Sequence, residues 1–250
     1  YTQKAYSYIT KRQGKILLNA AVKKIIIRNN RVQYLELGRG KAKRGKVKAD
    51  LYVAAVSPVD LRQILPEQAL FTDFFRHLNA FEGVPYITVN LWFNRKITNK
   101  KFWCLLNTEE TPEYMNTDFY DYSNILKGKR NYSFITSNII YSKPYNSMSD
   151  DEIVKKTLEE LKAAFPKMKA KLTHHHVHRI PYAIYAPYPG MRQHKLTYNT
   201  PVKNFYLAGD WLIREGPQCM EAAVRAGYGC AEAILSGFGI KKKICDEAVD

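Results

Sequence analysis

The sequence predicts a mixed fold: an α/β part that is interrupted along the chain, and an α+β part, mostly antiparallel, inserted into it. Near the C-terminus an apolar strand ends in Gly209-Asp210, and a helix rich in small residues opens at about Met220. Between these ends of the chain, aromatic-rich segments alternate in polarity as half-buried strands do. The α/β part is expected to comprise residues 1–65 and 201–240, and the insertion residues 66–200. Residues 241–250 would form a polar tail.

The α/β part is expected to begin with strands. Residues 15–27 and 31–37 read as two strands around a turn at Asn29-Asn30. Residues 49–56 form a continuous apolar run, which is typical of a buried parallel strand. Ser57-Pro58 ends that run, and a helix is expected to follow.

The insertion is expected to hold strands at 86–93, 102–106, 132–141 and 172–180. Ser149 and Glu152 have the spacing of a capping box, so a helix is expected from there to Pro166.

Histidines alternate along the last of these strands. His174, His176 and His178 would share one face of it, and three imidazoles can bind zinc. No acidic or cysteine ligand completes the set, so we expect a surface strand face and no metal site.

The chain of 250 residues carries a formal net charge of +16 and has no apolar run long enough to span a bilayer. Such charge favours an anionic membrane surface or nucleic acid, or is simply solvated. No RNA- or DNA-binding motif accompanies it, so no nucleic-acid partner is expected. The four cysteines lack metal spacing, which suggests a reducing compartment. We therefore expect a cytoplasmic protein with peripheral contact to the inner face of a membrane. The basic runs are Lys41 to Lys48, Lys127 to Arg130, Lys167 to Lys171 and Lys241 to Lys243.

The strand, glycine turn and helix near the C-terminus aim backbone N–H groups at one place, which suits an anion or a polarised carbonyl. The segment Leu207 to Ala223 resembles the C-terminal FAD-binding motif of the flavin-containing amine oxidase and phytoene desaturase superfamily. The segment Ala49 to Pro58 is similar to the strand by which that family returns to its nucleotide-binding sheet. The resemblance implies part of a Rossmann-like FAD-binding domain with an inserted substrate domain.

The resemblance also implies the residues that contact FAD. Gly209 would let the backbone approach the cofactor, and Asp210 would bond a ribityl hydroxyl. The backbone of Met220, Glu221 and Ala222 would face the pyrimidine edge of the flavin ring. Two more residues are assigned to the cofactor site by the same resemblance: Val22, which would contact adenine through its backbone, and Ala55.

Candidate substrate residues are aromatic or polar side chains near these motifs, and the sequence identifies no catalytic residue. Trp211 would lie beside the flavin, although a core tryptophan is an equal alternative. Tyr182 and Tyr185 lie in a proline-rich segment that would line an apolar pocket or form a rigid connector. Gln218 precedes the helix.

The family's N-terminal G-x-G-x-x-G fingerprint is missing from this chain. We therefore expect a further N-terminal FAD-binding segment as a partner, in the same gene or as a separate chain. The expected function is an FAD-dependent oxidoreductase of the desaturase or dehydrogenase type, which accepts a hydride from a small apolar substrate of the polyisoprenoid kind. The alternatives are a flavin amine oxidase and a non-catalytic module that binds a membrane surface.

Overall fold

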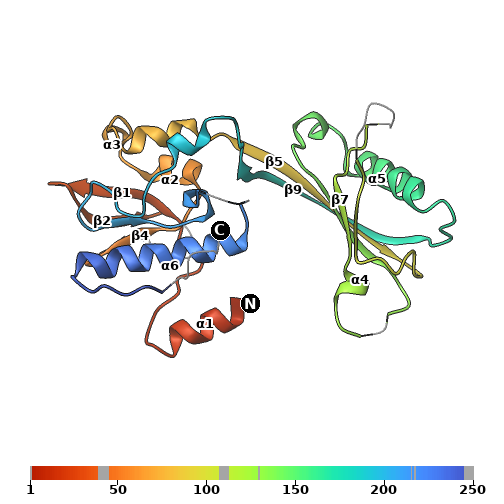
Figure 1. Cartoon of the computed structure of the whole chain (residues 1–250), viewed down its shortest axis with the longest axis horizontal. Coiled ribbons are helices and arrows are strands. Elements are labelled where there is room, and N and C mark those ends of the chain that lie inside the picture. Colours follow the sequence, from red (N-terminus) through yellow and green to blue (C-terminus); the bar gives the residue numbers. More distant parts are fainter. Residues whose placement is uncertain are drawn as a thin grey trace. The chain divides into compact units, whose positions relative to one another are not determined.

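A computed structural model of the chain describes residues 2–38, 45–106, 113–128, 130–214, 216 and 218–244. It divides into two compact units (Figure 1). Unit 1 comprises Tyr1–Glu82 and Pro187–Asp250, and unit 2 comprises Gly83–Ala186. The sequence predicted an insertion at residues 66–200, whereas the compact unit 2 comprises only residues 83–186.

An antiparallel sheet opens unit 1 after the helix α1 (Thr2–Thr10). Its strands are β1 (Val22–Arg28), β2 (Arg31–Leu37) and β3 (Lys46–Val47), in that order. Asn29 and Asn30 both have left-handed backbone, with φ of 51° and 57°. Two such residues in a two-residue loop match the right-handed twist of a hairpin. The predicted strand from residue 15 was too long, because residues 15–21 lie outside β1 with the side chains of Leu17 and Leu18 exposed rather than entering a core.

A parallel pair of strands forms the second sheet of unit 1, as the apolar runs predicted. β4 (Tyr52–Ala54) pairs with β10 (Phe205–Leu207). The helix α6 (Met220–Gly237) packs on this pair, with Cys230 buried against Tyr206 and Ala208 (Figure 1). Unit 1 also contains short helices: α2 (Pro58–Ile64), α3 (Glu67–Leu70), η1 (Phe75–Ala80), η3 (Met191–His194) and η4 (Asp210–Leu212).

One buried side chain connects the two sheets of unit 1. Asn204 is 1% exposed and immediately precedes β10. Its Oδ1 accepts from the Val32 amide at 2.8 Å, and its Nδ2 donates to the carbonyls of Val32 and Asp50 at 3.0 and 3.3 Å. The amide of a single asparagine therefore satisfies backbone groups of β2 and of the entry to β4.

Unit 2 is built on a five-stranded antiparallel sheet, as the sequence predicted, in the order β6-β7-β8-β5-β9. The strands are β5 (Gly83–Phe93), β6 (Phe102–Cys104), β7 (Asp118–Asp121), β8 (Phe134–Ile139) and β9 (Leu172–Tyr185). Alternate residues of β5, including Ile87, Val89 and Leu91, enter a core that the helix α5 (Asp150–Ala164) covers. Two short helices complete the unit: α4 (Tyr122–Ile125) and η2 (Lys143–Tyr145).

The face of this sheet that does not enter the core carries aromatic rings. Trp92 stacks on Phe134 with ring centroids 4.5 Å apart, and Phe134 lies 5.6 Å from Tyr122. The row continues through Tyr120 to Phe102 at 6.4 and 5.0 Å. We call these five residues the aromatic row. The three histidines of β9 do share this face, opposite Trp92 and its alternate neighbours on β5. No cluster of three metal-ligating side chains occurs in the described ranges.

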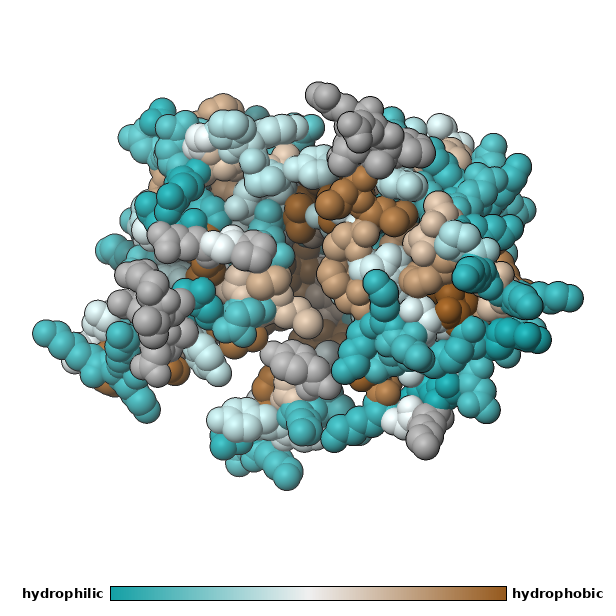
Figure 2. All heavy atoms as spheres, turned by 45° about the vertical axis from the view of Figure 1, so that its right-hand side comes forward, coloured by the Kyte–Doolittle hydropathy of each residue, from teal (hydrophilic) through white to brown (hydrophobic). Residues whose placement is uncertain are grey.

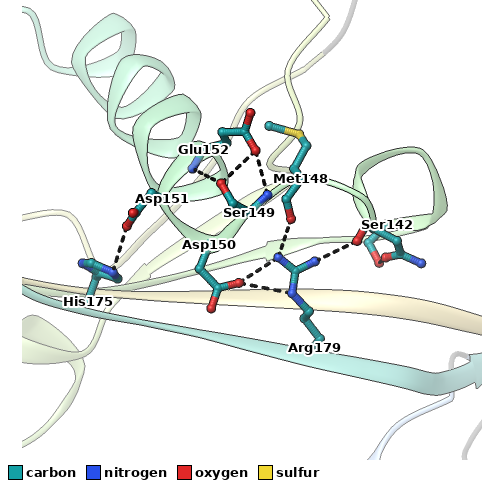
Figure 3. Close-up of polar contacts among 9 residues, drawn as sticks. Ser142, Met148, Ser149, Asp150, Asp151, Glu152, His175 and Arg179 are labelled. Atoms are coloured by element: carbon teal, nitrogen blue, oxygen red, sulfur yellow. Dashed lines mark hydrogen bonds and ion pairs between the residues drawn. The ribbon is translucent and has the colours of Figure 1, made fainter.

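The start of α5 is closed by the predicted capping box (Figure 3). The Glu152 amide donates to Ser149 Oγ at 3.3 Å, and the Ser149 amide donates to Glu152 Oε2 at 2.7 Å. Arg179 of β9 then ties the same helix end to the sheet, with its Nη2 2.7 Å from Asp150 Oδ1 and 2.8 Å from the Met148 carbonyl oxygen. These contacts fix how α5 lies on the sheet.

Ser149→Ala is expected to lower the free energy of unfolding of unit 2 by about 1 kcal/mol, because the Glu152 amide loses its acceptor. Urea unfolding monitored by circular dichroism would measure the change. Ser147→Ala is the matched control, because this exposed serine lies just outside the helix and is not its N-cap. Equal effects of the two substitutions would contradict a capping role.

Candidate functional site

The carboxyl ends of β4 and β10 lie side by side in unit 1. The Ala208 amide donates to the Ala54 carbonyl at 2.9 Å, so the next residues, Gly209 and Ala55, leave the sheet at the same edge. In open α/β sheets, ligands bind in the crevice beyond the carboxyl ends of the strands. The two residues that the sequence assigned to the cofactor on these strands are therefore adjacent at that edge.

Gly209 has a backbone conformation that only glycine adopts readily, with φ 138° and ψ 152°. A Cβ atom placed on it would lie 2.6 Å from Trp211 Nε1. The absence of a side chain thus lets the chain turn sharply from β10 into η4, with the tryptophan folded back against the turn.

Asp210 begins η4 directly after that turn, and its side chain is half-buried. Burial raises the pKa of the Asp210 carboxyl above its usual value, while the Trp211 amide and the Lys195 ammonium act in the opposite direction. The carboxylate is a charged hydrogen-bond acceptor at the edge of the sheet. Such a group suits a hydroxyl donor like those of a ribityl chain.

Trp211 lies in the core of unit 1, with 1% of its surface exposed. Its Nε1 donates to the Val56 carbonyl at 3.1 Å, and its ring meets Phe81 edge-on at 5.4 Å. These contacts match the core alternative that the sequence left open. They also fix η4 to the loop after β4, and so hold Asp210 in place.

The helix α6 presents an uncapped N-terminus near η4, against which it packs. Its N-cap residue, Cys219, makes no hydrogen bond through its side chain. Met220 is 82% exposed, and Ala222 is buried. The first amides of an 18-residue helix therefore have no side-chain acceptor from the N-cap, and the helix dipole adds positive potential there. Together with Asp210, this donor and acceptor set fits the pyrimidine edge and ribityl hydroxyls of a flavin.

The other predicted residues lie in several places. Val22 begins β1, in the antiparallel sheet of unit 1, and Glu221 is exposed on the first turn of α6. Gln218 lies in the loop before α6. Tyr182 and Tyr185 belong instead to β9 of unit 2. The Tyr182 ring covers Gly83, where an added Cβ would come within 1.9 Å of the ring. The structure thus brings together Gly209, Asp210, Ala55 and the start of α6. The roles of all these residues toward a cofactor or substrate stay predictions.

Two buried polar residues of unit 1 had no signal in the sequence, Asn204 at the amino end of β10 and Lys195 after η3. Asn204 connects the two sheets, and Lys195 donates from its Nζ to the Ile213 carbonyl at the end of η4. An asparagine and a lysine outside any motif read as ordinary loop residues. Only their burial in the folded unit distinguishes them.

Comparison with known families identifies the chain. Residues 3–235 match the model of the family "Flavin containing amine oxidoreductase". A 15-cis-phytoene desaturase of an Oncidium hybrid cultivar is 34% identical over 239 residues, which cover 90% of this chain and 39% of that protein. The corresponding enzyme of Solanum lycopersicum is 30% identical and is covered to 42%. A zeta-carotene desaturase of Arabidopsis thaliana is 28% identical and is covered to 44%. The chain thus spans about two fifths of the length of these relatives.

Solved structures show the same fold. An oxidoreductase from Methanosarcina mazei matches with a TM-score of 0.65 and 15% identity, over 92% of this chain and 52% of that one. A reduced UDP-galactopyranose mutase matches with a TM-score of 0.68 and 12% identity, over 95% of this chain and 50% of that one. The resemblance seen in the sequence motifs is confirmed: the chain belongs to the flavin-containing amine oxidoreductases, a family of FAD-dependent oxidoreductases.

Proposed function

We propose that the chain is the C-terminal part of an FAD-dependent desaturase or dehydrogenase that takes a hydride from an apolar, polyisoprenoid-like substrate. The observation that carries the proposal is the edge formed by Gly209, Asp210 and the start of α6, in a chain whose relatives include phytoene and zeta-carotene desaturases. The proposal concerns the whole protein, of which this chain would supply one part.

In this proposal the residues of unit 1 bind and orient the cofactor. FAD, when bound, supplies hydride acceptance, which no protein side chain provides. Asp210 would accept a hydrogen bond from a ribityl hydroxyl, and the first amides of α6 would donate to the pyrimidine edge. The helix end would favour negative charge there by about 0.5–2 kcal/mol.

The apolar substrate class is favoured over an amine by two observations. An amine substrate usually requires an aromatic cage open to the flavin, whereas Trp211 is buried and its indole N–H is already bonded to Val56. The aromatic row of unit 2 offers half-exposed rings suited to a long apolar chain. The flavin amine oxidase is therefore the second candidate.

An N-terminal FAD-binding segment is part of the proposal. The parallel sheet of unit 1 has only β4 and β10 in the described chain, and Val53 on β4 is 48% exposed. Two strands alone make a marginal sheet, so a further strand beside β4 would be stabilising. The segment that supplies it would also bring the pyrophosphate-binding turn that this chain lacks.

An absorption spectrum tests the proposed function. The chain would be expressed with the coding sequence that precedes it, and separately alone. We expect the bands of oxidised flavin in the first preparation and weak or no flavin in the second. A colourless first preparation that also fails to take up added FAD would contradict the proposal and favour the non-catalytic module.

Peripheral membrane contact remains a prediction. In the described parts of the chain no helix is long and apolar enough to cross a membrane. Hydrophilic residues cover much of the face drawn in Figure 2, with hydrophobic patches between them. Of the basic runs, the described lysines at 167–171 and 241–243 are exposed, while Lys41, Lys43, Arg44 and Lys129 lie outside the described residues.

We expect the protein to sediment with anionic liposomes at low salt and to be released as salt approaches about 0.5 M, because exposed charges are screened within several ångströms there. Sedimentation with neutral liposomes is the control. Binding that is absent, or that salt does not change, would remove the electrostatic contact from the proposal.

A further inference from the structure

Lys195 is a buried lysine in unit 1. Its exposed fraction is 9%, and it is the one basic residue of the described chain that falls among the buried side chains. It directly follows η3 and forms the C-cap of that turn. A buried ammonium is costly unless it is paired and hydrogen-bonded. The contacts of the Lys195 ammonium therefore show what compensates for its burial.

The Lys195 ammonium is bonded to the turn that carries Asp210. Its Nζ donates to the Ile213 carbonyl, and Ile213 is the residue that ends η4. The Ile213 amide in turn donates to the Asp210 carbonyl at 3.2 Å. The Ile213 amide thus closes the turn internally, and the Ile213 carbonyl links the turn to Lys195 at the end of η3. A chain segment only three residues long gains an external anchor in this way.

Charge couples the same two residues. Burial lowers the pKa of the Lys195 ammonium, and the Asp210 carboxylate opposes that shift. Burial raises the pKa of Asp210, and Lys195 opposes that shift in turn. Arg192 and Arg214 also act on Lys195, and as cations they reinforce the effect of burial on its pKa. The opposite charges of Lys195 and Asp210 therefore favour each other.

We propose that Lys195 is a positioning residue of the flavin site, which anchors the Asp210 turn through the Ile213 carbonyl and holds the Asp210 carboxylate as a hydrogen-bond acceptor for FAD. This inference rests on the proposed function, because it takes Asp210 to be a cofactor ligand. Lys195 acts through Asp210 and η4 rather than on the substrate.

Lys195→Met tests the proposal, because methionine keeps an unbranched apolar side chain but removes the charge and the donors. The dissociation constant of FAD would be measured by titrating the apoprotein, expressed with its N-terminal segment. We expect it to rise about tenfold or more, as loss of a hydrogen bond to a charged group implies. Lys195→Arg should recover part of the affinity, since arginine keeps a charged donor. Lys203→Met, at an exposed lysine of the same unit, is the control.

A double-mutant cycle separates positioning from loss of packing. If Lys195 acts through Asp210, then Lys195→Met should have little effect on FAD affinity once Asp210→Ala has removed the acceptor. The pH profile should move as well: as pH falls, FAD affinity should drop at a higher pH in Lys195→Met than in the parent protein, because Asp210 has lost its cation. The proposal would be overturned if the two substitutions had additive effects on FAD affinity and if Lys195→Met left the pH dependence of that affinity unchanged.

The outcomes also separate this inference from the proposed function. If Asp210→Ala leaves FAD affinity unchanged, the proposed site itself is wrong. If Asp210→Ala weakens FAD binding while Lys195→Met binds FAD as the parent protein does, only the role of Lys195 is wrong. Thermal unfolding of each apoprotein checks folding, and Lys195→Gln would enter the same cycle if Lys195→Met does not fold.

Discussion

Gly209→Ala is expected to destabilise unit 1 by about 2–4 kcal/mol, combining backbone strain with a steric clash. The glycine has φ 138°, and the new Cβ would meet Trp211 Nε1 at 2.6 Å. Trp211 cannot move away without losing its bond to the Val56 carbonyl and its contact with Phe81. Thermal and urea unfolding of the apoprotein would measure the loss, and FAD content should fall with it.

A second glycine isolates the steric contribution. Gly128 also has a positive φ, 109°, but an added Cβ there would meet no atom within 4 Å. Gly128→Ala should therefore cost only the conformational part, about 1–2 kcal/mol. If both substitutions lowered the free energy of unfolding by the same small amount, the close contact between Gly209 and Trp211 would be contradicted.

Asp210→Ala is expected to weaken FAD binding by about 1.5–3 kcal/mol, or roughly ten- to 150-fold, because a charged acceptor is removed. Flavin titration of the apoprotein would measure it, with folding checked by circular dichroism. Asp73→Ala is the matched control, since this carboxylate lies in the same unit with a side chain that is 96% exposed. Full flavin content in Asp210→Ala would place the cofactor elsewhere.

Although Asp210 is expected to strengthen FAD binding, its ionisation is expected to lower the stability of the apoprotein. Because burial raises the pKa of Asp210 in the folded state, its ionisation is less favourable there than in the unfolded chain. The stability that its neutral form contributes is present below the unfolded pKa of about 3.8 and is lost as pH rises through the folded pKa. Asp210→Asn cannot ionise, so its stability relative to the parent protein should increase across that window. A constant difference with pH would contradict the raised pKa.

Local patterns predicted those parts of the fold that local interactions decide. The capping box at Ser149, the small-residue helix from Met220 and the turn at Asn29-Asn30 each follow from residues a few positions apart, and the structure shows all three. Gly209 and Asp210 were identified because a strand, a turn and a helix follow one another along the chain.

The remaining features depend on contacts between distant segments. Asn204 bonds a residue 172 positions away, and Lys195 bonds the Ile213 carbonyl 18 positions further along the chain, so no short window of sequence reveals either. β7 is only four residues long and begins and ends with aspartate, so it lacks the apolar alternation of a strand. Asp121 is nevertheless fully buried, because Ser123 and Ser133 donate hydrogen bonds to it. Polar residues in pairs can thus replace the apolar pattern on which prediction relies.

The parallel pairing of β4 with β10 has a consequence for how the protein folds. The bond from Trp211 to the Val56 carbonyl, just beyond this pair, joins residues 155 positions apart, and all of unit 2 lies between them. Closing so long a loop costs entropy before any contact at the edge of the sheet repays it. The hairpin of β1 and β2 needs no such closure, and the pairing of β5 with β9 closes within unit 2 itself. We therefore expect the cofactor edge to be among the last parts to form, so that a newly made chain becomes able to retain flavin only after the insertion has folded.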